Sequence, residues 1–175
     1  MELLSAEQIE QALRRLGELA SAQDLQLDMA LVGGAVMTLA YHARASTRDV
    51  DAIFFSPPDA AQIRQLALQV GLEMNLPQDW LNDGAKGFVV GLELGQTLIA
   101  TQGITVRQVS AIQLLAMKLS AWRDDTDIQD AKRLLKEIDG SKEEIWARLE
   151  SFLSKGDELK AHYAFLDLWE SQYAQ

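Results

Sequence analysis

Val-Gly-Gly-Ala at residues 32–35 and Ser-Thr-Arg-Asp-Val-Asp at residues 46–51 determine which fold we expect for this chain. Alternating apolar residues before the glycines predict a strand over 25–32, and the apolar run after the aspartates predicts another over 50–55. Residues i and i+2 of a strand share a face, so Asp49 and Asp51 should point the same way. Two neighbouring carboxylates repel each other unless a cation lies between them. The pair therefore indicates a divalent-cation site at the rim of a core.

The glycine pair should face the same end of the sheet as the aspartates if the two strands are neighbours. Glycine has no side chain to keep a phosphate away from backbone N–H groups, and the start of the following helix favours anions. Taken alone, a glycine pair after a strand is ordinary turn chemistry, and Asp-x-Asp can be a solvated strand end. In combination, the two runs predict a magnesium–nucleotide site.

Composition limits the class of protein. The chain has 175 residues, 48% of them hydrophobic, and no cysteine, which is typical of a globular domain without disulfides or thiolate metal sites. Its first residues do not resemble a signal peptide, and no segment is apolar for long enough to span a bilayer, so a cytoplasmic location is expected. The formal net charge of −10 argues against a broad nucleic-acid-binding surface.

The order of helix and strand signals predicts an α+β fold, with a mixed β-sheet core flanked by helices and a C-terminal helical extension. Residues 1–110 are expected to form the core, and residues 111–175 a helical region packed on it. Ser5 with Gln8, and Ser141 with Glu144, match capping boxes. Helices are expected at about 6–22, 35–43, 59–70, 110–122, 126–138, 142–153 and 157–172, strands also at 88–93, 97–100 and 104–109, and a loop at 72–86.

The glycine and aspartate runs, with fourteen residues between Gly34 and Asp49, resemble the signature of the DNA polymerase β-type nucleotidyltransferase superfamily. Further runs resemble one branch of it, the small bacterial nucleotidyltransferase-like proteins related to toxins of abortive-infection toxin–antitoxin systems. These runs are Asp-Trp-Leu-Asn-Asp at 79–83, Lys-Gly-Phe at 86–88, and the segment 115–130 with Lys118, Arg123, Asp127 and Asp130. The likeness spans about residues 25–138.

The resemblance implies a nucleotidyltransferase-like fold and a Mg²⁺-dependent enzyme that moves a nucleoside monophosphate from an NTP to a hydroxyl acceptor, such as tRNA, a protein or a small molecule. It implies that Asp49 and Asp51 hold Mg²⁺, that Gly33 and Gly34 cradle the triphosphate, and that Lys118 neutralises phosphate charge. The nucleotide-binding set is expected to include Thr47, Arg48 and Asp127.

Two departures from the pattern bear on activity. Many members have a serine at the position of Gly34, so a hydroxyl contact to phosphate is missing. The third catalytic carboxylate normally comes from a neighbouring strand, and Glu93, on the strand expected at 88–93, is the best candidate for it.

The sequence is compatible with other functions and with other roles for several residues. The chain could be a catalytically inactive nucleotidyltransferase fold that acts as a binding or regulatory component beside an antitoxin partner, or an antibiotic-modifying adenylyltransferase. Lys118 could be a surface lysine, Arg44 and Arg48 could bind phosphate or simply be solvated, and Trp80 could close the edge of a cleft or anchor its loop. The sequence leaves the oligomeric state open.

Overall fold

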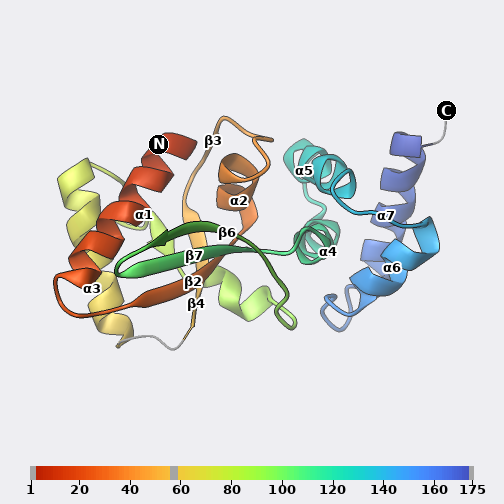
Figure 1. The fold of residues 1–175 in the computed structure, drawn as a ribbon. Helices are drawn as coiled ribbons and strands as arrows, with labels where there is room; N and C mark the ends of the chain where they lie inside the picture. Colours follow the sequence, from red (N-terminus) through yellow and green to blue (C-terminus); the bar gives the residue numbers. More distant parts are fainter. Residues whose placement is uncertain (1–2, 56–58, 174–175) are drawn as a thin grey trace. The chain divides into compact units, whose positions relative to one another are not determined.

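The computed structural model describes residues 3–55 and 59–173, which form the expected α+β fold with a mixed β-sheet (Figure 1). The chain divides into two compact units. The first contains the chain up to Lys86 together with Leu94–Gln108, and the second contains Gly87–Glu93 together with the chain from Val109 onward.

The first unit is built on a sheet with the strand order β5-β4-β2-β7-β6. The central strand β2 pairs antiparallel with β4 and parallel with β7, and β4 pairs parallel with β5. Strand β2 lies in the interior of the sheet, and side chains on both of its faces are buried. The strands are β2 (Leu27–Val32), β4 (Val50–Phe55), β5 (Leu81–Asn82), β6 (Leu94–Thr101) and β7 (Ile104–Val109).

A second, two-stranded sheet pairs β1 (Leu4–Ser5) antiparallel with β3 (Ser46–Thr47). Neither strand was predicted, because two residues are too few for a period-2 pattern to be read from sequence. The pairing fixes the segment directly before Asp49. It therefore matters for the geometry of the predicted site.

The three helices described in the first unit are α1 (Ala6–Ser21), α2 (Gly33–Leu39) and α3 (Ala60–Met74), and α1 lies beside α3 (Figure 1). The capping box that begins α1 is confirmed, with Gln8 N–H donating to Ser5 Oγ at 3.2 Å and Ser5 N–H donating to Gln8 Oε1 at 2.9 Å. Helix α3 continues past Gly71 and ends at Asn75, a left-handed residue, so the predicted end at residue 70 was too early.

The strand predicted at 88–93 is wrong. A 3₁₀ helix η1 (Gly84–Phe88) precedes an irregular segment that contains Gly91 at a φ of +64°. The side chain of Gln113 takes the place of a strand partner, because its Nε2 donates to the carbonyls of Val90 and Gly91 at 3.1 Å and its Oε1 accepts from Glu93 N–H at 2.9 Å. A single buried side chain thus satisfies the backbone groups that a sheet would otherwise pair.

The helices of the second unit are α4 (Ala111–Ala121), α5 (Asp125–Leu135), α6 (Lys142–Glu150) and α7 (Glu158–Tyr173). Helix α4 contacts each of the other three. The predicted caps are confirmed, since Ser110 accepts from Gln113 N–H and Ser141 forms a capping box with Glu144. Within residues 3–55 and 59–173, no helix combines the length and the apolar character that a membrane crossing requires.

Candidate functional site

The glycine turn, Gly33–Gly34, lies against Asp51, the second aspartate of the predicted site, in the first unit. Val32, the last residue of β2, pairs with Asp51 in the antiparallel register of β4. Gly33 follows with a φ of +64°, and a Cβ added to it would lie 3.4 Å from Asp51 Oδ2. The backbone of Gly33 therefore reaches a carboxylate with no side chain between them, as the sequence predicted for the end of neighbouring strands.

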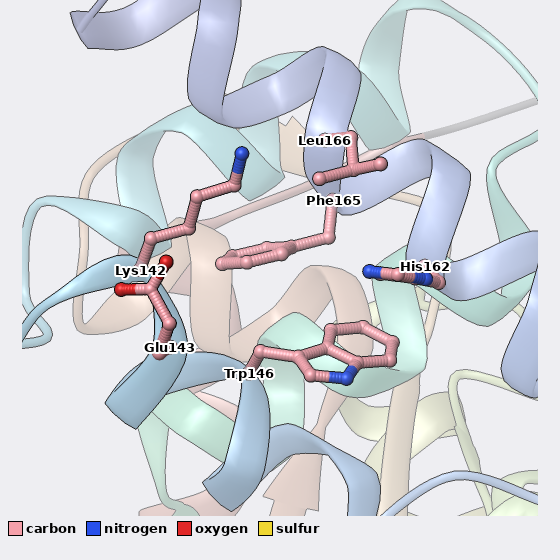
Figure 2. Close-up of a pocket in the computed structure, with 6 residues that line it drawn as sticks. All are labelled: Lys142, Glu143, Trp146, His162, Phe165 and Leu166. Atoms are coloured by element: carbon pink, nitrogen blue, oxygen red, sulfur yellow. The ribbon is translucent and has the colours of Figure 1, made fainter.

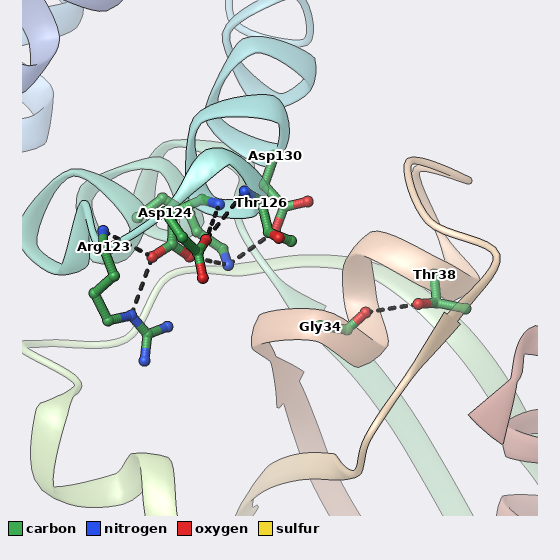
Figure 3. A network of polar contacts seen from close by, with 8 residues as sticks. Gly34, Thr38, Arg123, Asp124, Thr126 and Asp130 are labelled. Carbon is green, nitrogen blue, oxygen red and sulfur yellow. Dashed lines mark hydrogen bonds and ion pairs between the residues drawn. The ribbon is translucent and has the colours of Figure 1, made fainter. Parts of the chain in front are cut away.

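Gly34 has a packing reason of its own. A Cβ on Gly34 would overlap Thr47 Oγ1 and would lie 3.3 Å from Arg44 Nη1. The hydroxyl of buried Thr47 thus occupies the space that a side chain at position 34 would need. Figure 3 shows Gly34 and Thr38, whose Oγ1 donates to the Gly34 carbonyl at 2.9 Å. Position 34 has no serine hydroxyl, but the hydroxyl of Thr47 lies beside the same turn.

Substitution of Gly34 by alanine is expected to lower the free energy of unfolding by about 1–3 kcal/mol, because the new Cβ overpacks against Thr47. The loss should shrink in a Thr47→Ala background, where the overlapping hydroxyl is gone. Urea denaturation of the two single variants and the double variant measures this coupling. Gly87→Ala is the matched control, because a Cβ at Gly87 meets nothing within 4 Å. Equal losses in both backgrounds would contradict the packing.

Asp49 is half-buried and lies next to the edge strand β5. Asn82 Nδ2 donates to Asp49 Oδ2 at 3.3 Å, and Asn82 is also the register partner of Asp51. Both aspartates are therefore adjacent to Asn82. Arg48, the residue before Asp49, is exposed. Sequence reasoning did not assign Asn82 a role, since it stands 33 residues from Asp49 and no local pattern links the two.

Trp80 anchors the strand that carries Asn82. Its side chain is fully buried, its indole Nε1 donates to the Ala67 carbonyl of α3 at 2.9 Å, and its own carbonyl accepts from Val50 N–H at 2.7 Å. Of the two interpretations of Trp80 left open by the sequence, these contacts favour the anchor.

The residues at this turn fit a Mg²⁺ ion in type and in number. Mg²⁺ prefers oxygen ligands, and proteins often hold it with one or two carboxylates, the remaining positions being filled by water and substrate phosphates. Asp49 and Asp51 supply two carboxylates, and the bare Gly33 backbone lies against one of them. Among the described residues, no group of three or more His, Cys, Asp or Glu side chains is placed to hold a metal. Glu93, the predicted third carboxylate, is exposed and belongs to the irregular segment of the second unit, not to a strand.

In the second unit, Lys118 lies in a cluster of buried charges. Its Nζ is 2.9 Å from Asp127 Oδ1 and 2.8 Å from Asp130 Oδ2, and all three side chains are buried. The backbone N–H and Nε of Arg123 both donate to Asp127 Oδ2, at 3.2 and 3.1 Å. Figure 3 shows Arg123 and Asp130 of this cluster. Lys118 thus ties α4 to α5, an arrangement that a surface lysine would not adopt, and its predicted contact with phosphate stays a prediction.

The electrostatics of Asp127 follow from these contacts. Burial by itself would raise the pKa of this carboxyl, but hydrogen bonds from Arg123 and Lys118 and the charge of Lys118 outweigh it and lower the pKa to about 2. Asp124 caps the same helix and accepts from the N–H groups of Thr126 and Asp127, both at 3.0 Å. Asp127 is therefore held ionised as an acceptor at the first turn of α5.

The lowered pKa predicts a pH dependence of stability. The folded-state pKa lies below the ordinary value of 3.8, so the ionised carboxylate stabilises the fold above about pH 4, and the contribution is lost as the pH falls towards 2. At 1.36 kcal/mol for each unit of pKa, the contribution is about 2 kcal/mol. In urea denaturation, the difference between wild type and Asp127→Asn should shrink by that amount between pH 5 and pH 2. A difference that does not change with pH would contradict the ion cluster.

A pocket of about 230 Å³ lies between α6 and α7 (Figure 2). The rings of Trp146 and His162 form part of it, with centroids 4.5 Å apart. Its lining is Lys142, Glu143, Trp146, His162, Phe165 and Leu166. None of the residues that the sequence predicts for the site lines this pocket. The candidate site is therefore the glycine turn with Asp49 and Asp51 in the first unit.

Comparisons with curated proteins and with solved structures give no significant match. A family model described as "Nucleotidyltransferase of unknown function (DUF6036)" matches residues 7–171, nearly the whole chain, including the glycine turn, both aspartates and the Lys118 cluster. With the matched range covering both units, the chain belongs to this nucleotidyltransferase family.

Proposed function

We propose that this protein transfers a nucleoside monophosphate from an NTP to a hydroxyl acceptor, with Mg²⁺ held by Asp49 and Asp51. The observation that carries the proposal is the closeness of Gly33 to Asp51. A Cβ added to Gly33 would lie 3.4 Å from Asp51 Oδ2. The bare glycine backbone leaves room for a polyphosphate beside a carboxylate that would hold the cation. Membership of a nucleotidyltransferase family supports the same chemistry.

The residues around the turn divide the work of binding and positioning. When bound, Mg²⁺ would supply charge neutralisation for the phosphates and would lower the pKa of an acceptor hydroxyl. Asp49 and Asp51 would hold and orient the ion, and the Gly33–Gly34 turn would leave room for the triphosphate. Arg44, whose Nη1 lies beside the position of a Gly34 Cβ, and exposed Arg48 offer positive charge to the phosphate oxygens. We also propose the contacts with nucleotide or metal that the sequence predicts for Lys118, Asp127 and Glu93.

The charge of the protein bears on the class of acceptor. A formal net charge of −10 disfavours a long phosphate-binding surface, although residues 29–123 hold seven acidic and seven basic residues and can accept one nucleotide. A tRNA end, a protein hydroxyl and a small molecule each present the single hydroxyl that the reaction needs. Transfer from NTPs labelled at the α-phosphate to tRNA, to protein or to small alcohols distinguishes these acceptors.

The proposed function is tested by thermal unfolding with each NTP, with and without Mg²⁺. A ligand at one hundred times its dissociation constant adds about 2.7 kcal/mol to stability, which a melting curve resolves readily. Protection that requires both Mg²⁺ and nucleotide supports the site. Protection without transfer to any acceptor favours an inactive, regulatory member of the family, and no protection by any NTP contradicts the proposed function.

A further inference from the structure

Asn82 links Asp49, the residue directly before β4, to Gly84, the first residue of η1. Its Nδ2 donates to Asp49 Oδ2 at 3.3 Å, and its Oδ1 accepts from Gly84 N–H at 2.9 Å. The backbone N–H of Gly84 can only donate, so it fixes the amide oxygen on its own side and turns the NH₂ group towards the carboxylate. The orientation of this amide is thus set by the backbone of Gly84 at the start of η1 and not by Asp49 itself.

The backbone on both sides of Asn82 holds it in this position. Leu81 and Asn82 pair with Val50 and Asp51 in a parallel register, and the buried Trp80 ties the strand to α3 through its bond to the Ala67 carbonyl. A Cβ on Gly84 would lie 3.0 Å from Asn82 Oδ1, so the backbone at the start of η1 packs closely against the amide. Asn82 is therefore a fixed donor beside the two aspartates.

From these contacts we infer that Asn82 is a positioning residue for the cation site: it holds the Asp49 carboxylate in the orientation that binds the metal. This inference rests on the proposed function. The donated N–H occupies one lone pair of Oδ2, which leaves Oδ1 and the rest of Oδ2 to face a cation. Outer-shell partners of this kind orient metal-binding carboxylates, and their loss costs about 10- to 100-fold in metal affinity.

An amide at this position also sets the charge of the site. Asn82 is neutral and stands opposite Asp51, so the site carries two negative charges where a carboxylate at residue 82 would give three. Asparagine replaced by aspartate keeps the acceptor for Gly84 N–H and presents a second oxygen to the cation. Aspartate has no N–H to donate to Asp49, so Asn82→Asp and Asn82→Ala both lose the hydrogen bond that orients Asp49, and only Asn82→Asp adds a negative charge.

The test is a titration of the full-length protein with Mn²⁺ alone, followed by the loss of the free-ion electron paramagnetic resonance signal. Asn82→Ala should weaken Mn²⁺ binding about 10- to 100-fold. Gln78→Ala, which removes an exposed amide from the segment between α3 and β5, should bind as wild type does. Urea denaturation of each variant verifies that it folds.

The outcomes separate this inference from the function on which it rests. If wild type binds Mn²⁺ and Asp51→Ala does not, but Asn82→Ala binds like wild type, the positioning role is wrong and the proposed function stands. If wild type and Asp51→Ala bind Mn²⁺ equally, the proposed metal site falls, and the role of Asn82 falls with it.

Discussion

Replacement of Lys118 by methionine is expected to destabilise the protein by about 3–5 kcal/mol, because it leaves two buried carboxylates without their shared cation. Lys118 Nζ lies within 3 Å of both Asp127 and Asp130, and the two aspartate side chains are each 2% exposed. Removing a charge partner at a buried site costs far more than removing an exposed one, since water cannot replace the partner. Methionine keeps most of the length of the side chain, so the loss measures the charge.

Urea denaturation at pH 7 measures this loss, with Lys155→Met as the matched control. Lys155 is exposed in the loop before α7, and the same substitution there should change the free energy of unfolding by less than about 0.5 kcal/mol. A change at Lys118 as small as that at Lys155 would show that the ion cluster contributes little. Lys118 would then be open to the phosphate-binding role that the sequence predicted.

Asparagine in place of Asp49 or Asp51 is expected to reduce nucleotidyl transfer at least a thousandfold, equivalent to about 4 kcal/mol of transition-state stabilisation. Both substitutions keep the shape of the side chain and remove one of the two charges that the proposed Mg²⁺ site requires. Thermal protection by Mg²⁺ and nucleotide should be lost in the same variants. The fold should persist, because both aspartates are half-buried at the start of a strand and outside the apolar core.

Transfer of label from each α-labelled NTP, at saturating Mg²⁺, measures the effect. Asp83→Asn is the control. Asp83 is exposed and directly follows Asn82, so its substitution removes one charge near the site without removing a proposed ligand. Variants of Asp49 and Asp51 that retain transfer within tenfold of wild type would contradict their assignment as metal ligands. A matching loss in Asp83→Asn would point to net charge as the cause.

The helices were predictable because their signals are local. Ser5 with Gln8, and Ser141 with Glu144, lie three residues apart, and each capping box forms as the spacing predicts. The antiparallel neighbours β2 and β4 were also within reach, because a glycine turn, a short helix and an apolar strand follow one another along the chain. That order put Gly33 beside Asp51, as expected.

The failures come from contacts between residues far apart in sequence. Residues 88–93 have a strand-like composition, yet the side chain of Gln113, about twenty residues away, binds their backbone and Gly91 turns the chain. The same difficulty hides Asn82, whose amide meets Asp49 from a two-residue strand that no periodicity reveals. Both features depend on tertiary contacts. The sequence alone could therefore predict neither the irregular segment that contains Glu93 nor the contact between Asn82 and Asp49.

The measurement that most directly tests whether Asp49 and Asp51 form a cation site beside the glycine turn is nuclear magnetic resonance with Mn²⁺. Small additions of the paramagnetic ion broaden amide signals near the place where it binds. We predict that the amides of Gly33, Asp49 and Asp51 broaden first, and that Asp51→Asn abolishes the effect. Sharp signals from all three amides, while signals elsewhere in the protein broaden, would contradict a cation site at this turn.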